Sequence, residues 1–235
     1  MPENKQKDGS NMRQDDKQET NRLQETETGQ TEYAVKDAKS SRHSKGKEVL
    51  SYLLPMAIAF AAAIVVSNVV LINAVIPSKS MENLLHKKDR LFGFRLAYAL
   101  EDPQRYDVVM FHYPVHEETI YIKRVIGLPG ETVEIKKGRI YIDGAKEPIK
   151  EDYLPEKWMT GNDGFVFEVP KDCYMMLGDN RNISGDSRYW AQEAVDGGVA
   201  ANWEEAKQYT YVHKDKIIGR AILKYYPNFH WFINI

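Results

Sequence analysis

Three polar segments contain the residue types that could carry out chemistry. Residues 77–81 read PSKSM, residues 121–131 read YIKRVIGLPGE, and residues 178–188 read GDNRNISGDSR. A serine hydroxyl becomes an effective nucleophile when a base removes its proton, and a lysine can be that base only while its amine is neutral. Taken alone, each segment also fits an ordinary role: a polar turn, a strand with a solvent-facing lysine, and a turn whose Asp and Asn bond their own backbone.

In this order, the three segments together resemble the bacterial type I signal peptidases, the membrane-bound serine proteases of the Ser/Lys kind. The first is similar to that family's nucleophile box, the second to its lysine box and the third to its C-terminal box. Residues 217–227, IIGRAILKYYP, also fit the family. The resemblance covers residues 77–190 and 212–227, together with the apolar run that precedes them.

Some residues depart from the family pattern. Residues 81–85 read MENLL where members commonly have Met-x-Pro-Thr-Leu, and residues 105–107 read RYD where Arg-Gly-Asp is common. Residues 191–211 look like an insertion. These differences concern local backbone geometry and specificity, and they leave the proposed chemical groups in place.

The resemblance implies a role for each polar residue. It makes Ser80 the nucleophile and Lys123 the general base, which requires burial to lower the lysine pKa by about 2–3 units from its usual value near 10.4. The hydroxyl of Ser78 and the backbone N–H of Ser80 would stabilise the oxyanion. Ser184 would hydrogen-bond the lysine and fix its direction.

The remaining implied residues support the site without taking part in the chemistry. Asp179 and Asp186 match acidic residues that pair with arginines, and their expected partners are Arg124 and Arg188. No metal and no cofactor is implied. His112 and His116 have the four-residue spacing of a helical metal pair, but Pro114 lies between them in a segment that reads as the end of a strand. The six histidines are therefore assigned to surface or packing roles.

An apolar run precedes the first polar segment. Residues 49–76 contain no charged side chain, and about 20 apolar residues suffice to cross a bilayer. A cleaved signal peptide would begin nearer the N-terminus and have a shorter run, so we expect an uncleaved single-pass anchor. Basic residues crowd its N-terminal side: Lys36, Lys39, Arg42, Lys45 and Lys47. They predict a cytoplasmic N-terminus and an extracytoplasmic domain.

Composition separates the rest of the chain into two parts. Residues 1–48 hold ten Lys/Arg and ten Asp/Glu against seven apolar residues, which predicts a disordered cytoplasmic tail. Residues 77–235 hold nearly all the aromatic residues and form the predicted catalytic domain. The net charge of -2 gives no reason to expect a nucleic-acid partner. Cys173 is the only cysteine, so no disulfide can form within the chain.

Short β-branched runs dominate this domain. They predict strands at 108–113, 119–126, 132–136, 139–142, 165–169, 173–177 and 217–225. Lys137-Gly138 predicts a hairpin turn, and residues 191–207 a loop with a short helix. The predicted fold is mostly β, with one N-terminal transmembrane helix followed by a coiled β-sheet or barrel-like domain of the signal peptidase type.

The leading hypothesis is a signal peptidase I, a serine endopeptidase that removes signal peptides from translocated preproteins at the bilayer surface and close to the secretion translocon. Six apolar residues could dip into lipid or bind the substrate strand, or could pack in the core: Leu84, Leu85, Leu91, Phe92, Phe94 and Leu96. One alternative is a self-cleaving Ser/Lys protease, which would need an internal scissile site. Another is a non-enzymatic scaffold, which labelling of Ser80 by a penem would exclude.

Overall fold

The computed structural model describes residues 49–232, and the predicted disordered tail, residues 1–48, lies outside them. The described residues divide into two units, with the boundary between Ala63 and Ile64. One helix, Val49–Val70, is long and apolar enough to cross a membrane. At the 1.5 Å rise of a helix its 22 residues extend over about 33 Å, close to the thickness of a hydrocarbon core.

The helix is shorter than the uncharged run of residues 49–76. Its last residues, Val66–Val70, form the π-helix η1, and Leu71–Val75 form strand β1. Strand β1 pairs in antiparallel fashion with β2 (Arg90–Phe94). Because the Ile72 side chain is 6% exposed in the core next to β2, packing favours a strand where composition alone favoured a continued helix.

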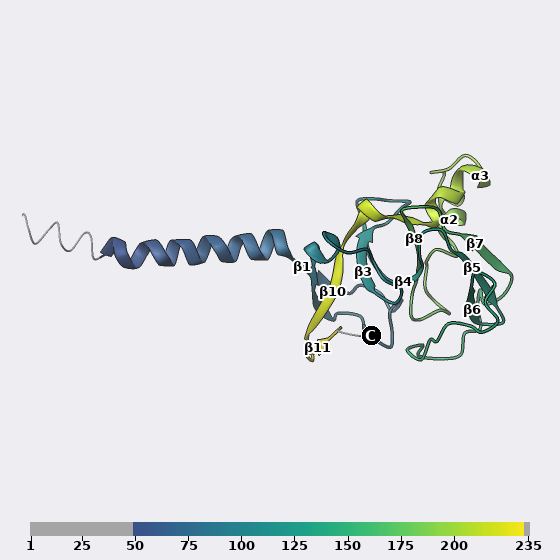
Figure 1. Ribbon diagram of the computed structural model, residues 1–235, viewed down its shortest axis with the longest axis horizontal. Coiled ribbons are helices and arrows are strands. Elements are labelled where there is room, and N and C mark those ends of the chain that lie inside the picture. The colour runs from purple at the N-terminus through teal and green to yellow at the C-terminus, as the bar shows by residue number, and fades with distance from the viewer. Residues whose placement is uncertain (1–48, 233–235) are drawn as a thin grey trace, which may run out of the picture. The chain divides into compact units, whose positions relative to one another are not determined.

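Antiparallel strands make up most of the second unit, as Figure 1 shows. The large sheet has the order β1-β2-β10-β3-β4-β8-β9, with β11 beside β10, and a second sheet has the order β6-β5-β7. The other strands are β3 (Val108–His112), β4 (Ile120–Gly127), β5 (Thr132–Lys136), β6 (Arg139–Ile142), β7 (Phe165–Glu168), β8 (Cys173–Leu177), β9 (Val212–His213), β10 (Ile217–Tyr226) and β11 (His230–Trp231). The mostly-β prediction is confirmed, and the large sheet is open rather than closed into a barrel.

The turn between β5 and β6 has the predicted hairpin geometry. Lys137 has φ 49° and Gly138 has φ 71°, so both central residues lie in the left-handed region. This combination defines a type I′ turn, whose twist matches that of the two strands it joins.

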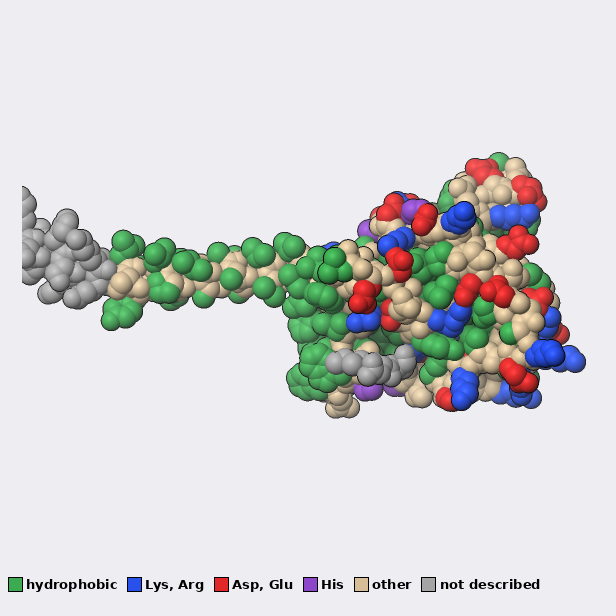
Figure 2. Space-filling model, in the orientation of Figure 1, with side chains coloured by type: hydrophobic (Ala, Val, Ile, Leu, Met, Phe, Trp, Pro, Cys, Tyr) green, Lys and Arg blue, Asp and Glu red, His purple; other side chains and the backbone are tan. Residues whose placement is uncertain are grey.

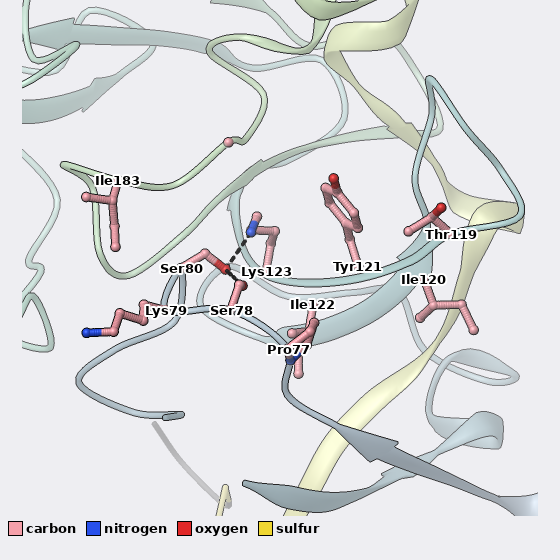
Figure 3. Close-up of a pocket in the computed structure, with 11 residues that line it drawn as sticks. Pro77, Ser78, Lys79, Ser80, Thr119, Ile120, Tyr121, Ile122, Lys123 and Ile183 are labelled. Atoms are coloured by element: carbon pink, nitrogen blue, oxygen red, sulfur yellow. Dashed lines mark hydrogen bonds between the residues drawn. The ribbon is translucent and has the colours of Figure 1, made fainter. Parts of the chain in front are cut away.

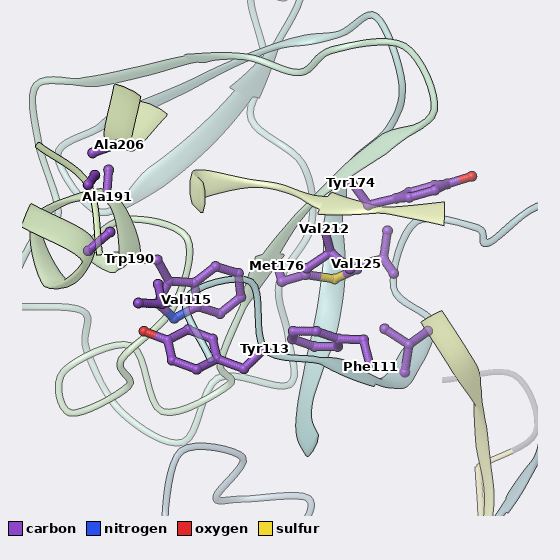
Figure 4. Packing of buried hydrophobic residues seen from close by; sticks show 13 residues of the cluster. Phe111, Tyr113, Val115, Val125, Tyr174, Met176, Trp190, Ala191, Ala206 and Val212 are labelled. Carbon is purple, nitrogen blue, oxygen red and sulfur yellow. The ribbon is translucent and has the colours of Figure 1, made fainter. Parts of the chain in front are cut away.

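Residues 191–211 are part of the folded core. They contribute most of α2 (Trp190–Asp196), together with α3 (Trp203–Ala206) and the 3-10 helix η3 (Lys207–Thr210). Trp190 and Ala206 are fully buried, in one apolar cluster with side chains of β3, β4 and β8 (Figure 4). The expected loop with a short helix is therefore two short helices and a 3-10 turn that pack on the sheet.

The six apolar residues that follow the helix have different environments. Leu85 and Leu91 are 0% exposed and belong to the core, and the ring of Phe92 stacks on Tyr225 with centroids 4.6 Å apart. Leu96, in contrast, is 47% exposed. Packing thus accounts for the most buried members of the set.

Apolar side chains also gather on the surface of the domain at the end formed by β1, β10 and β11 (Figure 2). The exposed side chains there include Val75, Tyr226, Phe229 and Trp231. Scattered apolar residues are normal on a protein surface, whereas a contiguous group marks a surface suited to lipid or to another protein.

Candidate active site

Ser80 lies in a tight turn that follows β1. The Glu82 N–H donates to the Lys79 carbonyl at 3.2 Å, and the Leu85 N–H donates to the Met81 carbonyl at 2.8 Å. The side chains of Met81 and Leu85 are fully buried. They anchor the turn to the core, so that Ser80 is held at the base of a cleft with 8% of its surface exposed.

Lys123 extends from β4 to meet this serine. Its Nζ donates a hydrogen bond to Ser80 Oγ at 2.7 Å, and its side chain is 4% exposed (Figure 3). Ser78 Oγ lies 3.2 Å from the same Ser80 Oγ. The third polar segment joins them, because the Asn180 N–H donates to the Ser80 carbonyl at 3.0 Å. The three segments that the sequence singled out therefore meet at Ser80.

Burial controls the protonation of this lysine. Removal of the amine from water disfavours the ammonium form and lowers the pKa of Lys123 from 10.5 to about 8. The carboxylates of Asp186, Asp179 and Glu193 act in the opposite direction, while Arg188 adds to the lowering. Burial outweighs the acidic groups, so a substantial fraction of the amine is neutral at mildly alkaline pH.

Two ion pairs frame the site, and they join the predicted partners. Arg124 donates to Asp179 through Nε (2.8 Å) and Nη2 (2.7 Å), and both side chains are fully buried. Arg188 donates to Asp186 through Nε (2.7 Å) and Nη2 (2.8 Å). Bidentate arginine–carboxylate pairs fix both direction and distance, so the Arg124–Asp179 pair holds the loop after β8 against β4, while the Arg188–Asp186 pair fixes the loop itself.

Ser184 does not make the predicted hydrogen bond to Lys123. Among residues 49–232, its buried Oγ has no hydrogen-bond partner. A Cβ built on Gly178 would lie 2.2 Å from Ser184 Oγ and 2.5 Å from the Ser80 carbonyl oxygen, so only glycine fits there. Ser184 is therefore packed beside the backbone of Ser80 rather than bonded to the amine.

A cleft of about 520 Å³ opens onto Ser80 and Lys123. Its walls are largely apolar, with Ile120 and Ile122 from β4 and Ile183 from the loop after β8 (Figure 3). β4 pairs with β3 along residues 120–124, but its pairing with β8 begins only at Arg124. In the part of the chain that the structure describes, no strand occupies the other edge of residues 120–123, which leaves backbone groups for an extended peptide.

The sequence did not single out the aromatic wall beside Lys123. The ring centre of Tyr121 lies 5.4 Å from Lys123 Nζ, and Tyr113 stacks on Tyr121. The alternation of side chains in β4 was the available signal, since residues 121 and 123 share a face. No group of three or more His, Cys, Asp or Glu side chains within the described residues is arranged to hold a metal ion.

Known proteins resemble this chain in sequence. A family model described as "Signal peptidase, peptidase S26" matches residues 49–226. Signal peptidase I of Leptolyngbya laminosa is 36% identical over 162 residues, covering 65% of this chain and 67% of that protein. Signal peptidase I S of Bacillus subtilis strain 168 is 34% identical over 159 residues, covering 64% of this chain and 84% of that protein. A crystal structure of a signal peptidase I from Enterococcus faecalis V583 is 30% identical and covers 51% of this chain and 97% of that chain, with a TM-score of 0.37.

Proposed function

The chain belongs to the S26 family of signal peptidases, and from this membership we propose that Ser80 and Lys123 form the catalytic dyad with which it removes signal peptides. The observation that carries the proposal is the 2.7 Å hydrogen bond between Lys123 Nζ and Ser80 Oγ. A general base must also be neutral. Burial makes this possible, because it lowers the pKa of Lys123 to about 8 and allows the amine to act as a base.

In the first half of the reaction, the neutral amine of Lys123 accepts the proton of Ser80 as Oγ attacks the scissile carbonyl carbon. The resulting oxyanion receives hydrogen bonds from the backbone N–H of Ser80 and the hydroxyl of Ser78, and one such donor contributes about 3 kcal/mol. The carbon–nitrogen bond then breaks, and the lysine ammonium gives its proton to the leaving amine. An ester on Ser80 remains.

Water completes the turnover. The amine of Lys123 is neutral again, so it accepts a proton from the water that attacks the ester carbonyl. The second tetrahedral species collapses, and the lysine returns the proton to Ser80 Oγ. The products are a peptide with a new carboxylate and a mature chain with a new amine.

The cleft and the chain's arrangement suit a signal-peptide substrate. The free edge of β4 at residues 120–123 suits β-strand addition by an extended peptide. The apolar walls of the cleft suit small apolar side chains, which the family resemblance implies for the first and third residues before the cut. We place the N-terminus in the cytoplasm and the domain outside, near the secretion translocon. The apolar end at β1, β10 and β11 would contact the lipid surface, and a shared bilayer raises the effective concentration of enzyme and substrate.

The direct test measures cleavage of a preprotein by the purified full chain in detergent. Ser80→Ala and Lys123→Ala should each lower kcat by at least about 10³-fold, because each removes a group that acts on the reacting atoms. Lys136→Ala is the matched control, since it removes an exposed strand lysine from the other sheet and should leave the rate unchanged.

The pH dependence supplies a second readout. The kcat/KM of the unmodified chain should rise with pH to a half-maximal value near pH 8, as Lys123 loses its proton. Full activity in either the Ser80 or the Lys123 variant would refute the dyad. So would an active enzyme whose kcat/KM does not change between pH 6 and pH 9.

A further inference from the structure

We propose that Glu193 is a positioning residue for Lys123, through its negative charge and through its hydrogen bond to the first of two stacked tyrosines beside the amine. The inference rests on the proposed function, in which Lys123 is the general base. Glu193 lies on α2, within the segment 191–211 that the sequence predicted to be an insertion.

A chain of contacts connects the two residues. The hydroxyl of Tyr113, just after β3, donates a hydrogen bond to Glu193 Oε2. The Tyr113 ring stacks on Tyr121 with centroids 4.3 Å apart and an interplanar angle of 3°. The Tyr121 ring in turn faces Lys123 Nζ at 5.4 Å. A carboxylate on α2 therefore fixes the outer ring of a stack whose inner ring borders the amine.

A second residue of α2 supports the same stack. Trp190 is 0% exposed, and it makes edge contacts with Tyr113 at 5.5 Å and with Tyr121 at 6.3 Å. Figure 4 shows its indole packed against Tyr113 and Phe111. Helix α2 thus presents an indole to the rings and a carboxylate to the phenol, and together these leave the stack little freedom to move.

The charge of Glu193 also differs from that of the other nearby acids. Asp179 is paired with Arg124, and Asp186 is paired with Arg188. Within the described part of the chain, Glu193 forms no ion pair, and its Oε1 lies 3.3 Å from the position a Cβ would take on Gly185, a residue that lines the cleft. Its negative charge is therefore not balanced by an ion-pair partner among these residues.

The sign of this effect can be tested. A nearby carboxylate favours the ammonium form and raises the pKa of Lys123, against the larger lowering by burial. Glu193→Gln keeps a hydrogen-bond acceptor for Tyr113 but removes the charge. We expect its kcat/KM profile to shift to lower pH by about 0.3 to 0.5 of a unit at low salt, and by less at high salt, because Glu193 is exposed and its field is screened.

Tyr113→Phe separates position from charge, since it keeps the ring but removes the bond to Glu193. We expect kcat to fall about 5-fold with KM unchanged, because the reacting groups are held less firmly. Glu204→Gln is the matched control: it removes an exposed carboxylate from α3 in the same segment and should change neither quantity.

All assays use the full chain in detergent with a signal-peptide substrate. An unshifted Glu193→Gln profile or an unchanged kcat in Tyr113→Phe would overturn the inference. So would an equal shift in Glu204→Gln, which would reveal only net charge. The loss of some folded protein would lower the rate without moving the midpoint, so misfolding cannot imitate the expected result. If Lys123→Ala retains activity, the proposed function fails. If Lys123→Ala is inactive and Glu193→Gln behaves as the unmodified chain, only this inference fails.

Discussion

Lys123 and Arg124 are adjacent basic residues in β4, yet they meet opposite environments. Successive side chains in a strand point to opposite faces, so one strand delivers its two cations to different partners. Both are buried, with exposures of 4% and 0%. Lys123 Nζ meets a serine hydroxyl, whereas Arg124 meets the carboxylate of Asp179 through two hydrogen bonds.

The difference suits the two buried cations to different roles: a structural one for Arg124 and, in the proposed dyad, a reactive one for Lys123. Arg124 keeps its charge because a guanidinium does not lose its proton in proteins and because Asp179 balances it. Lys123 has no carboxylate within ion-pair distance among the described residues, and burial lowers its pKa to about 8. A full ion pair would stabilise the lysine's charge and would remove its capacity to act as a base.

Replacement of the lysine by a second arginine should produce the largest effect. Lys123→Arg places a permanently protonated group beside Ser80, so we expect cleavage to fall at least about 10³-fold at every pH tested. Circular dichroism would confirm that the variant folds. Recovery of activity at high pH would contradict the assignment of the base, because the guanidinium cannot supply one.

Removal of the other cation should affect stability most. Arg124→Met leaves the fully buried Asp179 without its partner, so we expect the free energy of unfolding to fall by about 3–5 kcal/mol, measured by urea titration in detergent. A second change, Asp179→Leu, should restore much of the loss. Lys207→Met breaks an exposed pair with Glu204 and should change stability by less than about 1 kcal/mol. Equal effects of Arg124→Met and Lys207→Met would mean that burial does not distinguish the two pairs.

A smaller and opposite effect is expected from Lys123→Met. The lysine pKa is lower in the folded chain (about 8) than its ordinary value of 10.5, so the unfolded chain binds more protons between these two pH values. The stability of the unmodified chain therefore rises with pH across this window, and the full penalty is present below it. We expect Lys123→Met to be more stable by about 3 kcal/mol at pH 7, with the difference shrinking as pH approaches 10.5. If Lys123→Met were less stable than the unmodified chain at pH 7, burial of the amine would not destabilise the folded protein.

Local sequence patterns predicted much of the sheet. The runs at 132–136, 139–142 and 173–177 coincide with β5, β6 and β8, because β-branched alternation and a Lys-Gly turn act over a few residues. Strand β2 was not predicted, although Leu91 and Phe92 were noted as apolar. Its place between β1 and β10 depends on a partner more than a hundred residues away, and no local pattern records that pairing.

The candidate site was predicted in part. Ordered motifs identified Ser80, Lys123 and the two arginine–aspartate pairs by resemblance, and the structure brings these residues together. The hydrogen bond expected from Ser184 is absent among the described residues. A motif match gives the type of a residue but not the direction in which its side chain points. Glu193 was not identified, because its contact with Tyr113 spans 80 positions and none of the three motifs contains it.

A soluble form of the protein without its anchor should begin before Leu71 rather than at Pro77. The apolar residues of β1 that resemble the end of a membrane segment form the outermost strand of the sheet, and Ile72 and Ile76 are 6% and 3% exposed. A cut at residue 77 would leave β2 with an unpaired edge above an opened core, a surface prone to edge-to-edge aggregation. For expression and crystallisation, these hydrophobic residues belong to the soluble domain and should be kept.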